Sequence, residues 1–98
     1  MPAYMILYTL SAEGAKAPKE IQAGVEQAHQ AVEAMGGQVV ACYALMGEYD
    51  FVGIYELPND EAAMRFALRM CASGSVKTKT LKAVTPEAFF ALLKELPE

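Results

Sequence analysis

The chain has 98 residues, a formal net charge of −4 and a hydrophobic fraction of 54%. This length and composition predict one domain over residues 1–98 with one core, and they exclude a separate second domain. An acidic chain is a poor match for nucleic-acid phosphates, and no apolar run reaches the roughly 18 residues of a membrane span. The N-terminal stretch also lacks the pattern of a signal peptide. We therefore expect a cytoplasmic domain with neither a nucleic-acid nor a membrane partner.

Two cysteines and one histidine restrict the redox and metal chemistry. Cys42 and Cys71 are too few for the disulfide framework of a small secreted domain, so we expect reduced, buried thiols. With one histidine and no CxxC pair, a structural zinc site lacks ligands at any recognisable spacing. We expect no metal and no cofactor.

The first half of the chain predicts a strand, a helix and a hairpin. Residues 4–10 form an apolar run typical of a strand, and residues 11–17 suit a loop before Pro18. Apolar residues at helical spacing then predict an amphipathic helix that ends at Gly36 and Gly37; they are Ile21, Val25, Ala28, Val32 and Met35. Strands over 38–46 and 51–57 follow, joined by a short connection of turn-forming residues that makes them antiparallel neighbours.

The second half predicts another helix, a strand and a terminal helix. Residues 58–61 provide a helix start, and the helix runs to about Ala72. Strand 76–84 carries Lys77, Lys79 and Lys82, which we interpret as the charged edge of a sheet. Thr85 and Pro86 begin a short terminal helix. This order predicts an α+β, ferredoxin-like βαββαβ sandwich with an antiparallel sheet and an added C-terminal helix.

The strands are apolar on both alternating faces. In strand 38–46 both faces are expected to be apolar. One face carries Val39, Ala41, Tyr43 and Leu45, and the other carries Val40, Cys42, Ala44 and Met46. Two helices cover one face only, and the terminal helix covers the other in part. Met64, Leu68 and Cys71 form a further apolar strip, on which we expect a terminal helix to dock, either the chain's own or a partner's. We therefore expect a homodimer or a higher homo-oligomer.

Several short motifs resemble a known family. They are Met1 to Tyr4, the pair Gly36 and Gly37, the turn from Met46 to Asp50, and the stretch from Gly74 to Leu81. Together they resemble the GYD-domain family over nearly the whole chain, and this resemblance implies a ferredoxin-like dimeric α/β barrel without an established activity. The hairpin and last strand are also similar to the effector-binding domain of leucine-responsive, AsnC-type regulators. That domain binds small molecules such as amino acids at oligomer interfaces.

The candidate site residues are polar side chains near the expected sheet interface. Tyr49 and Asp50 suit a tight turn, and they also place a hydroxyl and a carboxylate at the rim of a pocket between sheets. His29 lies at the edge of the buried helical stripe, where it is half-exposed or reaches inward as a general base or haem ligand. Other strand residues are expected to pack in the core or, if the barrel encloses a cavity, to line it: Tyr8, Tyr43, Tyr55, Thr78 and Thr80.

Three functions remain open at this point. The first is a module that binds a small, uncharged or zwitterionic molecule at or near the interface between two sheets. The alternative is an enzyme of the cofactor-independent monooxygenase or haem-degrading type, an analogy that rests on the fold alone. The third is a structural role, in which forming the oligomer is itself the function of the protein. The catalytic residues of the enzyme alternative stay unknown from the sequence.

Overall fold

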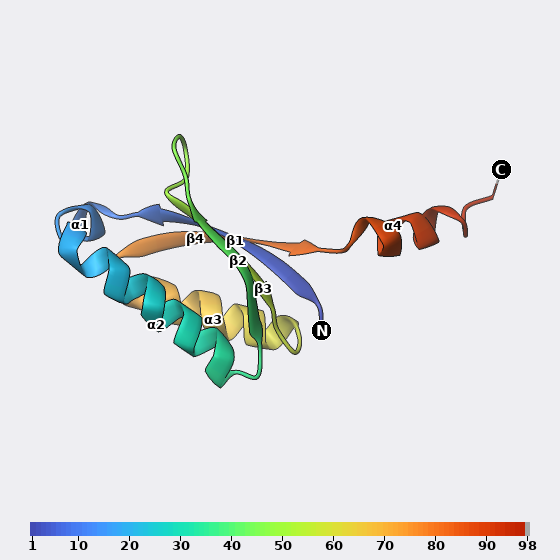
Figure 1. Ribbon diagram of the computed structural model, residues 1–98, viewed down its shortest axis with the longest axis horizontal. Coiled ribbons are helices and arrows are strands. Elements are labelled where there is room, and N and C mark those ends of the chain that lie inside the picture. The colour runs from blue at the N-terminus through green and yellow to red at the C-terminus, as the bar shows by residue number, and fades with distance from the viewer. Residues whose placement is uncertain (98) are drawn as a thin grey trace.

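Four antiparallel strands form one sheet, and two long helices cover one of its faces in the computed structural model, which describes residues 1–97 (Figure 1). The elements in chain order are β1 (Ala3–Leu10), α1 (Ala12–Ala15), a 3-10 turn (Pro18–Glu20), α2 (Ile21–Ala34), β2 (Gln38–Ala44), β3 (Phe51–Glu56), α3 (Asp60–Ala72), β4 (Val76–Ala83) and α4 (Pro86–Leu93). The predicted fold class, an α+β ferredoxin-like domain, is confirmed.

The strand order is β2-β3-β1-β4. β1 pairs antiparallel with both β3 and β4, and β2 pairs antiparallel with β3. The long helices α2 and α3 each join two strands that are separated by a third, which is the split βαβ arrangement. The lysine-bearing strand β4 lies at an edge of the sheet, as predicted.

The core lies between the sheet and its two long helices. Tyr4, Ile6 and Tyr8 of β1 point to this side and pair in register with Tyr55, Gly53 and Phe51 of β3, respectively. α2 contributes a stripe of small and branched residues at helical spacing: Ala28, Ala31 and Val32. From α3 the fully buried Phe66 packs its ring edge-on against Tyr55, with 5.3 Å between ring centroids. The amphipathic stripe predicted for the first long helix is therefore confirmed for Ala28, Val32 and Met35, which lie in or against the core, whereas Ile21 and Val25 are only partly buried.

The segment between β1 and α2 contains a short helix where a loop was expected. Ser11 begins it, because its hydroxyl accepts a hydrogen bond from the backbone N–H of Gly14 at 3.1 Å. Gly14 is buried against the backbone carbonyl of Ser75, and a Cβ atom on Gly14 would overlap that oxygen. The loop prediction over 11–17 was wrong in part because this helical turn depends on a contact with a distant residue.

β2 distributes its side chains differently from the sequence prediction. Val39 pairs with Tyr55, but Ala41 pairs with Ile54, so the register shifts between them. This β-bulge places Val39 on the helix side and Tyr43 on the open side, whereas strict alternation put both on one face. The predicted face assignment for this strand was wrong because an extra residue interrupts the period of two.

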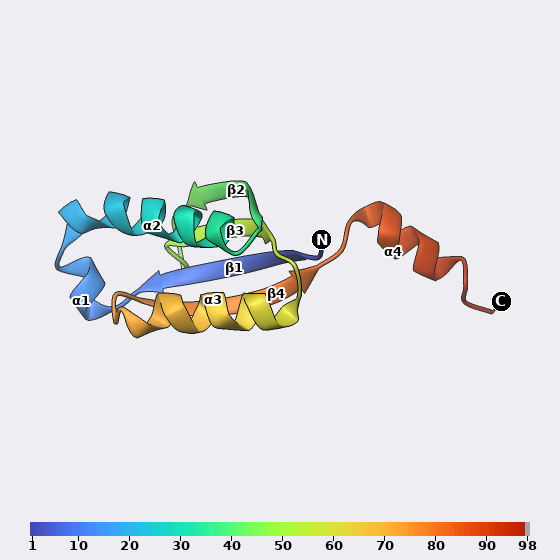
Figure 2. The same cartoon turned by 90° about the horizontal axis from the view of Figure 1, so that it is seen from below.

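The second face of the sheet is open, and the terminal helix does not cover it. Its centre is apolar, built from Met5, Leu7 and Ile54. α4 lies beyond the end of β4, apart from α2 and α3 (Figures 1 and 2). Its apolar side chains are each about half exposed: Phe89, Phe90, Leu92 and Leu93. The expected partial cover by the chain's own terminal helix was wrong.

The backbone before α4 accounts for this departure. Thr85 is extended, with φ −68° and ψ 155°, because a residue before proline avoids the helical region. The chain therefore continues outward from β4 before α4 begins, and the exposed Met64 and Leu68 of α3 receive no helix from their own chain. No helix within the described residues combines the length and apolar character needed to cross a bilayer.

Candidate ligand-binding site

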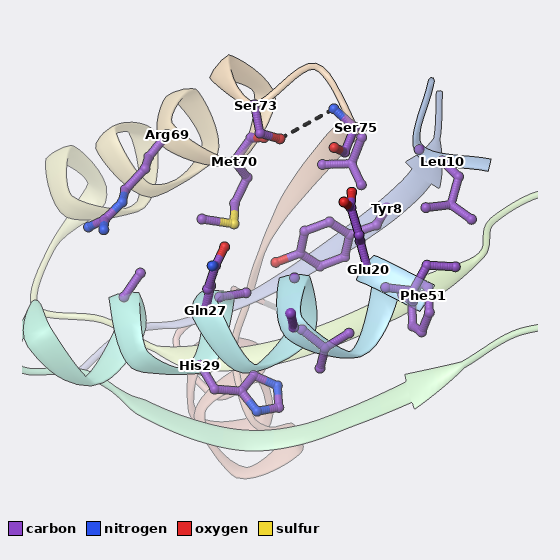
Figure 3. Close-up of a pocket in the computed structure, with 18 of the residues that line it drawn as sticks. Tyr8, Leu10, Glu20, Gln27, His29, Phe51, Arg69, Met70, Ser73 and Ser75 are labelled. Carbon is purple, nitrogen blue, oxygen red and sulfur yellow. Dashed lines mark hydrogen bonds between the residues drawn. The ribbon is translucent and has the colours of Figure 1, made fainter. Parts of the chain in front are cut away.

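A cavity of about 890 Å³ lies on the helix-covered side of the sheet. In Figure 3 the ring of Tyr8 lies in the gap between α2 and α3, while Gln27 and Met70 project into this gap from the two helices. Most of the wall is apolar and comes from both helices and the strands beneath: Leu10, Ala28, Ala31, Phe51, Met70 and Val76. The helices are therefore far enough apart to leave a volume that a small molecule can occupy.

Two tyrosines form the polar floor of this cavity. The hydroxyl oxygens of Tyr8 and Tyr55 are 2.7 Å apart, and the residues are 7% and 1% exposed. Burial raises the pKa of Tyr55 to about 12, and burial together with the neighbouring Tyr55 raises the pKa of Tyr8 well above its usual value. Both phenols are therefore neutral at physiological pH, so the pair has two O–H hydrogens and uses one of them in this bond.

Gly53 makes room for the Tyr55 hydroxyl. Both residues lie on the helix side of β3, two positions apart. A Cβ atom on Gly53 would overlap the Tyr55 oxygen, so any side chain there would displace the ring. Sequence reasoning missed this role, although a glycine inside a strand is the signal of a close approach by another group.

The mouth of the cavity is polar, whereas its interior holds no buried charge. Glu13, Glu20 and Arg69 line the mouth and are exposed. Among residues 1–97 no charged side chain is buried, and no cluster of three potential metal ligands occurs. The floor of the cavity therefore offers two neutral phenols, and the uncharged amide of Gln27 projects into the gap above them.

His29 does not join the phenol pair. It lies on α2 and is among the residues that line the cavity, but its ring lies on the β2 side of the helix (Figure 3). The residue is partly exposed, yet its Nε2 atom is buried without a hydrogen-bond partner. The structure therefore brings no base to the two phenols.

The remaining predicted lining residues do not gather in one place. Tyr43 lies on the open face and is 63% exposed, so it cannot line the same cavity as Tyr8. Thr78 contacts the sulfur of Cys71 at 3.3 Å, and Thr80 lines a separate hollow beside Asp60. Thr78 and Thr80 pair in register with Tyr8 and Ile6 on the helix side, so only Tyr43 lies on the opposite face. A ligand role for Tyr43, Thr78 and Thr80 stays a prediction.

The two cysteines are free but not equally covered. Cys42 is partly buried, which raises the pKa of its thiol, whereas Cys71 is exposed on α3. The prediction of two buried thiols was therefore wrong for Cys71, which stays exposed although its sulfur contacts Thr78 of β4.

The predicted hairpin residues hold the β2–β3 connection to β1. The carboxylate of Asp50 accepts a hydrogen bond from the backbone N–H of Leu10 at 2.8 Å, and the backbone N–H of Asp50 donates to the Tyr8 carbonyl at 2.8 Å. Gly47 adopts a φ of +117°, which favours glycine. Tyr49 accepts a long hydrogen bond, 3.5 Å, from Lys79. These contacts give the motif a structural role, and a ligand role for Tyr49 and Asp50 stays a prediction.

Replacing Asp50 should loosen this hairpin. We expect Asp50→Ala to lower the free energy of unfolding by about 1–3 kcal/mol, because the N–H of Leu10 loses its acceptor. Asp50→Asn keeps an acceptor oxygen and should lose less. Urea denaturation measures both, with Glu48→Ala in the same hairpin as the control, which should stay within about 0.5 kcal/mol. An Asp50→Ala protein as stable as the parent would contradict this role.

The protein is thus a small α+β module with a ferredoxin-like fold and a cavity on the helix-covered side of its sheet. Residues 4–93 match the model of the GYD domain, and the chain belongs to that family. The family resemblance expected from the sequence is thus confirmed. So is the weaker similarity to leucine-responsive regulators, which several solved structures show at the level of fold.

A curated relative and three solved structures give the range of similarity. The "glutamine synthetase and cystathionine beta-lyase binding protein" of Thermus thermophilus is 36% identical over 95 residues, 96% of this chain and 100% of the relative. The leucine response regulatory protein of Mycobacterium tuberculosis superimposes with a TM-score of 0.64 at 18% identity, over 86% of this chain and 51% of that one.

Two further structures extend this comparison. A feast or famine regulatory protein from M. tuberculosis, complexed with L-methionine, has a TM-score of 0.65 at 16% identity over 87% of this chain and 51% of that one. A small protein from Thermus thermophilus has a TM-score of 0.57 at 23% identity, over 87% of this chain and 95% of that one. This chain therefore spans about half the length of the regulators and nearly all of the smaller proteins.

Proposed function

We propose that the chain is a homo-oligomeric binding module in which each copy holds a small molecule in its own helix-side cavity. The observation that carries this proposal is the buried pair of Tyr8 and Tyr55, with one unused O–H hydrogen, at the floor of a cavity of about 890 Å³. The pocket expected from the sequence lay between two sheets. This cavity lies on the other side of the sheet, so binding and self-association use different surfaces.

Self-association is supported by apolar surface that the chain does not cover. Met5, Leu7 and Ile54 form the centre of the open face, and α4 adds further exposed apolar side chains. Each such side chain contributes about 1.5–3 kcal/mol when it is fully buried. A second copy packed on the open face at about 10 Å buries this surface without any other partner.

A variant that fills the cavity tests the binding proposal. Gly24 lies on α2 along the cavity, and a Cβ atom there meets nothing within 4 Å. We expect Gly24→Leu to fill part of the volume and to abolish ligand-induced stabilisation in a thermal-shift screen of amino acids and small aromatic compounds. Gln22→Leu, on the exposed side of α2, is the matched control. A ligand near 100 times its dissociation constant stabilises the native protein by about 2.7 kcal/mol. If no compound of the panel stabilised the parent protein, the result would contradict the proposal.

A second candidate function is the binding of a metabolic enzyme. It is favoured by the 36% identity, over the full length, to a relative that is named for binding glutamine synthetase and cystathionine beta-lyase. The exposed Met64 and Leu68 on α3 are an apolar surface available for such a contact. Surface plasmon resonance with each purified enzyme over the immobilised chain tests this function, and no response at micromolar enzyme would rule it out.

A further inference from the structure

We propose that the cavity selects neutral, largely apolar molecules that carry one oxygen acceptor, with an aryl ketone as the model compound, over carboxylates of the same shape. This inference rests on the proposed binding function and specifies its ligand class. It depends on three properties of the cavity: the hydrogen count of the phenol pair, the absence of buried charge among the described residues, and the composition of the mouth.

The phenol pair has one hydrogen to give. Whichever tyrosine donates in the 2.7 Å contact, the other oxygen keeps an O–H hydrogen that is not used in that bond. Within residues 1–97 neither hydroxyl has another hydrogen-bond partner. In Figure 3 the Tyr8 hydroxyl points into the gap between α2 and α3. A ligand oxygen that reaches this pair therefore accepts a hydrogen bond from a donor that burial makes costly to leave unpaired.

The interior disfavours a charged ligand group. A carboxylate placed at the phenol pair loses its hydration, and no buried cation among the described residues compensates it. A neutral carbonyl oxygen loses much less hydration and still accepts the hydrogen bond. The floor therefore discriminates by charge as well as by hydrogen bonding.

The mouth reinforces this discrimination. Of the three charged side chains that line the cavity, Glu13 and Glu20 are acidic and only Arg69 is basic. The local charge is therefore −1, which repels an approaching carboxylate weakly because these groups are exposed. The walls favour a flat apolar body, since Phe51 offers a ring and Met70 is a flexible side chain that adapts to different shapes.

Three naphthalene probes of the same shape test the ligand class. The probes are 2-acetylnaphthalene, which is neutral with an acceptor, 2-ethylnaphthalene, which is neutral without one, and 2-naphthoate, which is charged. Ligand-observed NMR titration of the parent protein measures the three dissociation constants. We expect the ketone to bind about two- to tenfold more tightly than the hydrocarbon, the range of one net hydrogen bond. The carboxylate should bind at least about tenfold more weakly than the ketone.

Removing the hydroxyls assigns the effect to the phenol pair. In the double variant Tyr8→Phe with Tyr55→Phe, the ketone should lose its advantage over the hydrocarbon, while the hydrocarbon binds as before. Removing both partners of a buried hydrogen bond leaves neither one unpaired, so this variant should stay folded. Tyr43→Phe, which removes an exposed hydroxyl on the open face, is the control and should change no constant.

The outcomes test the proposed ligand class and the existence of a binding cavity separately. Naphthoate binding as tightly as the ketone, or a ketone preference that survives in the double variant, would overturn the ligand class while leaving a working cavity. Failure of all three probes to bind the parent protein would overturn the cavity and the class together.

Discussion

Ile54→Lys is expected to convert the protein from an oligomer into folded monomers. Ile54 lies near the centre of the open face, where its neighbours in register are Met5 on β1 and Ala41 on β2. In a face-to-face pair the new ammonium would be buried opposite apolar side chains, and an unpaired buried charge costs far more than the contact contributes. Size-exclusion chromatography with light scattering gives the mass of both proteins at micromolar concentration.

A surface variant of the same charge controls for electrostatics. Gln22→Lys adds one positive charge to the exposed side of α2 and should leave the mass unchanged. Circular dichroism should show that Ile54→Lys keeps its secondary structure, because Ile54 is not part of the core between sheet and helices. A parent protein that is already monomeric and stably folded would remove the basis for self-association through this face.

Gly53→Ala is expected to destabilise the protein and to disturb the phenol pair at the same time. The added methyl group would overlap both the Tyr55 hydroxyl oxygen and the ring carbon that bears it. The ring cannot move aside freely, since Tyr55 is nearly fully buried and packs against Phe66. We expect the free energy of unfolding to fall by about 1–3 kcal/mol, the usual cost of overpacking, as measured by urea denaturation. The ketone preference should fall with it, because the phenol pair is displaced.

The same change at another glycine should act in the opposite direction. Gly24→Ala on α2 adds a methyl group that meets nothing within 4 Å, and alanine is the better helix former. It should raise the free energy of unfolding by about 0.5–1 kcal/mol. If Gly53→Ala were as stable as Gly24→Ala, the close contact between Gly53 and Tyr55 would be refuted.

The amino-acid pattern alone predicted the strands, the long helices and α4 in their correct order, but it missed the short helix α1. Helical spacing predicted α2 with Ala28 and Val32 buried, and a proline after a capping residue predicted α4, because these signals act over one or two turns. The motif from Gly47 to Asp50 predicted the hairpin and the family, and the positive φ of Gly47 is a local requirement of this connection. The carboxylate of Asp50, in contrast, accepts from Leu10 on the distant strand β1.

Which side of the sheet each feature occupies depends on contacts between distant parts of the chain. Tyr8 and Tyr55 are 47 positions apart, and their contact depends on the register of β1 against β3. A single bulged residue in β2 moved Tyr43 to the opposite face, because side chains alternate with a period of two and one insertion inverts everything beyond it.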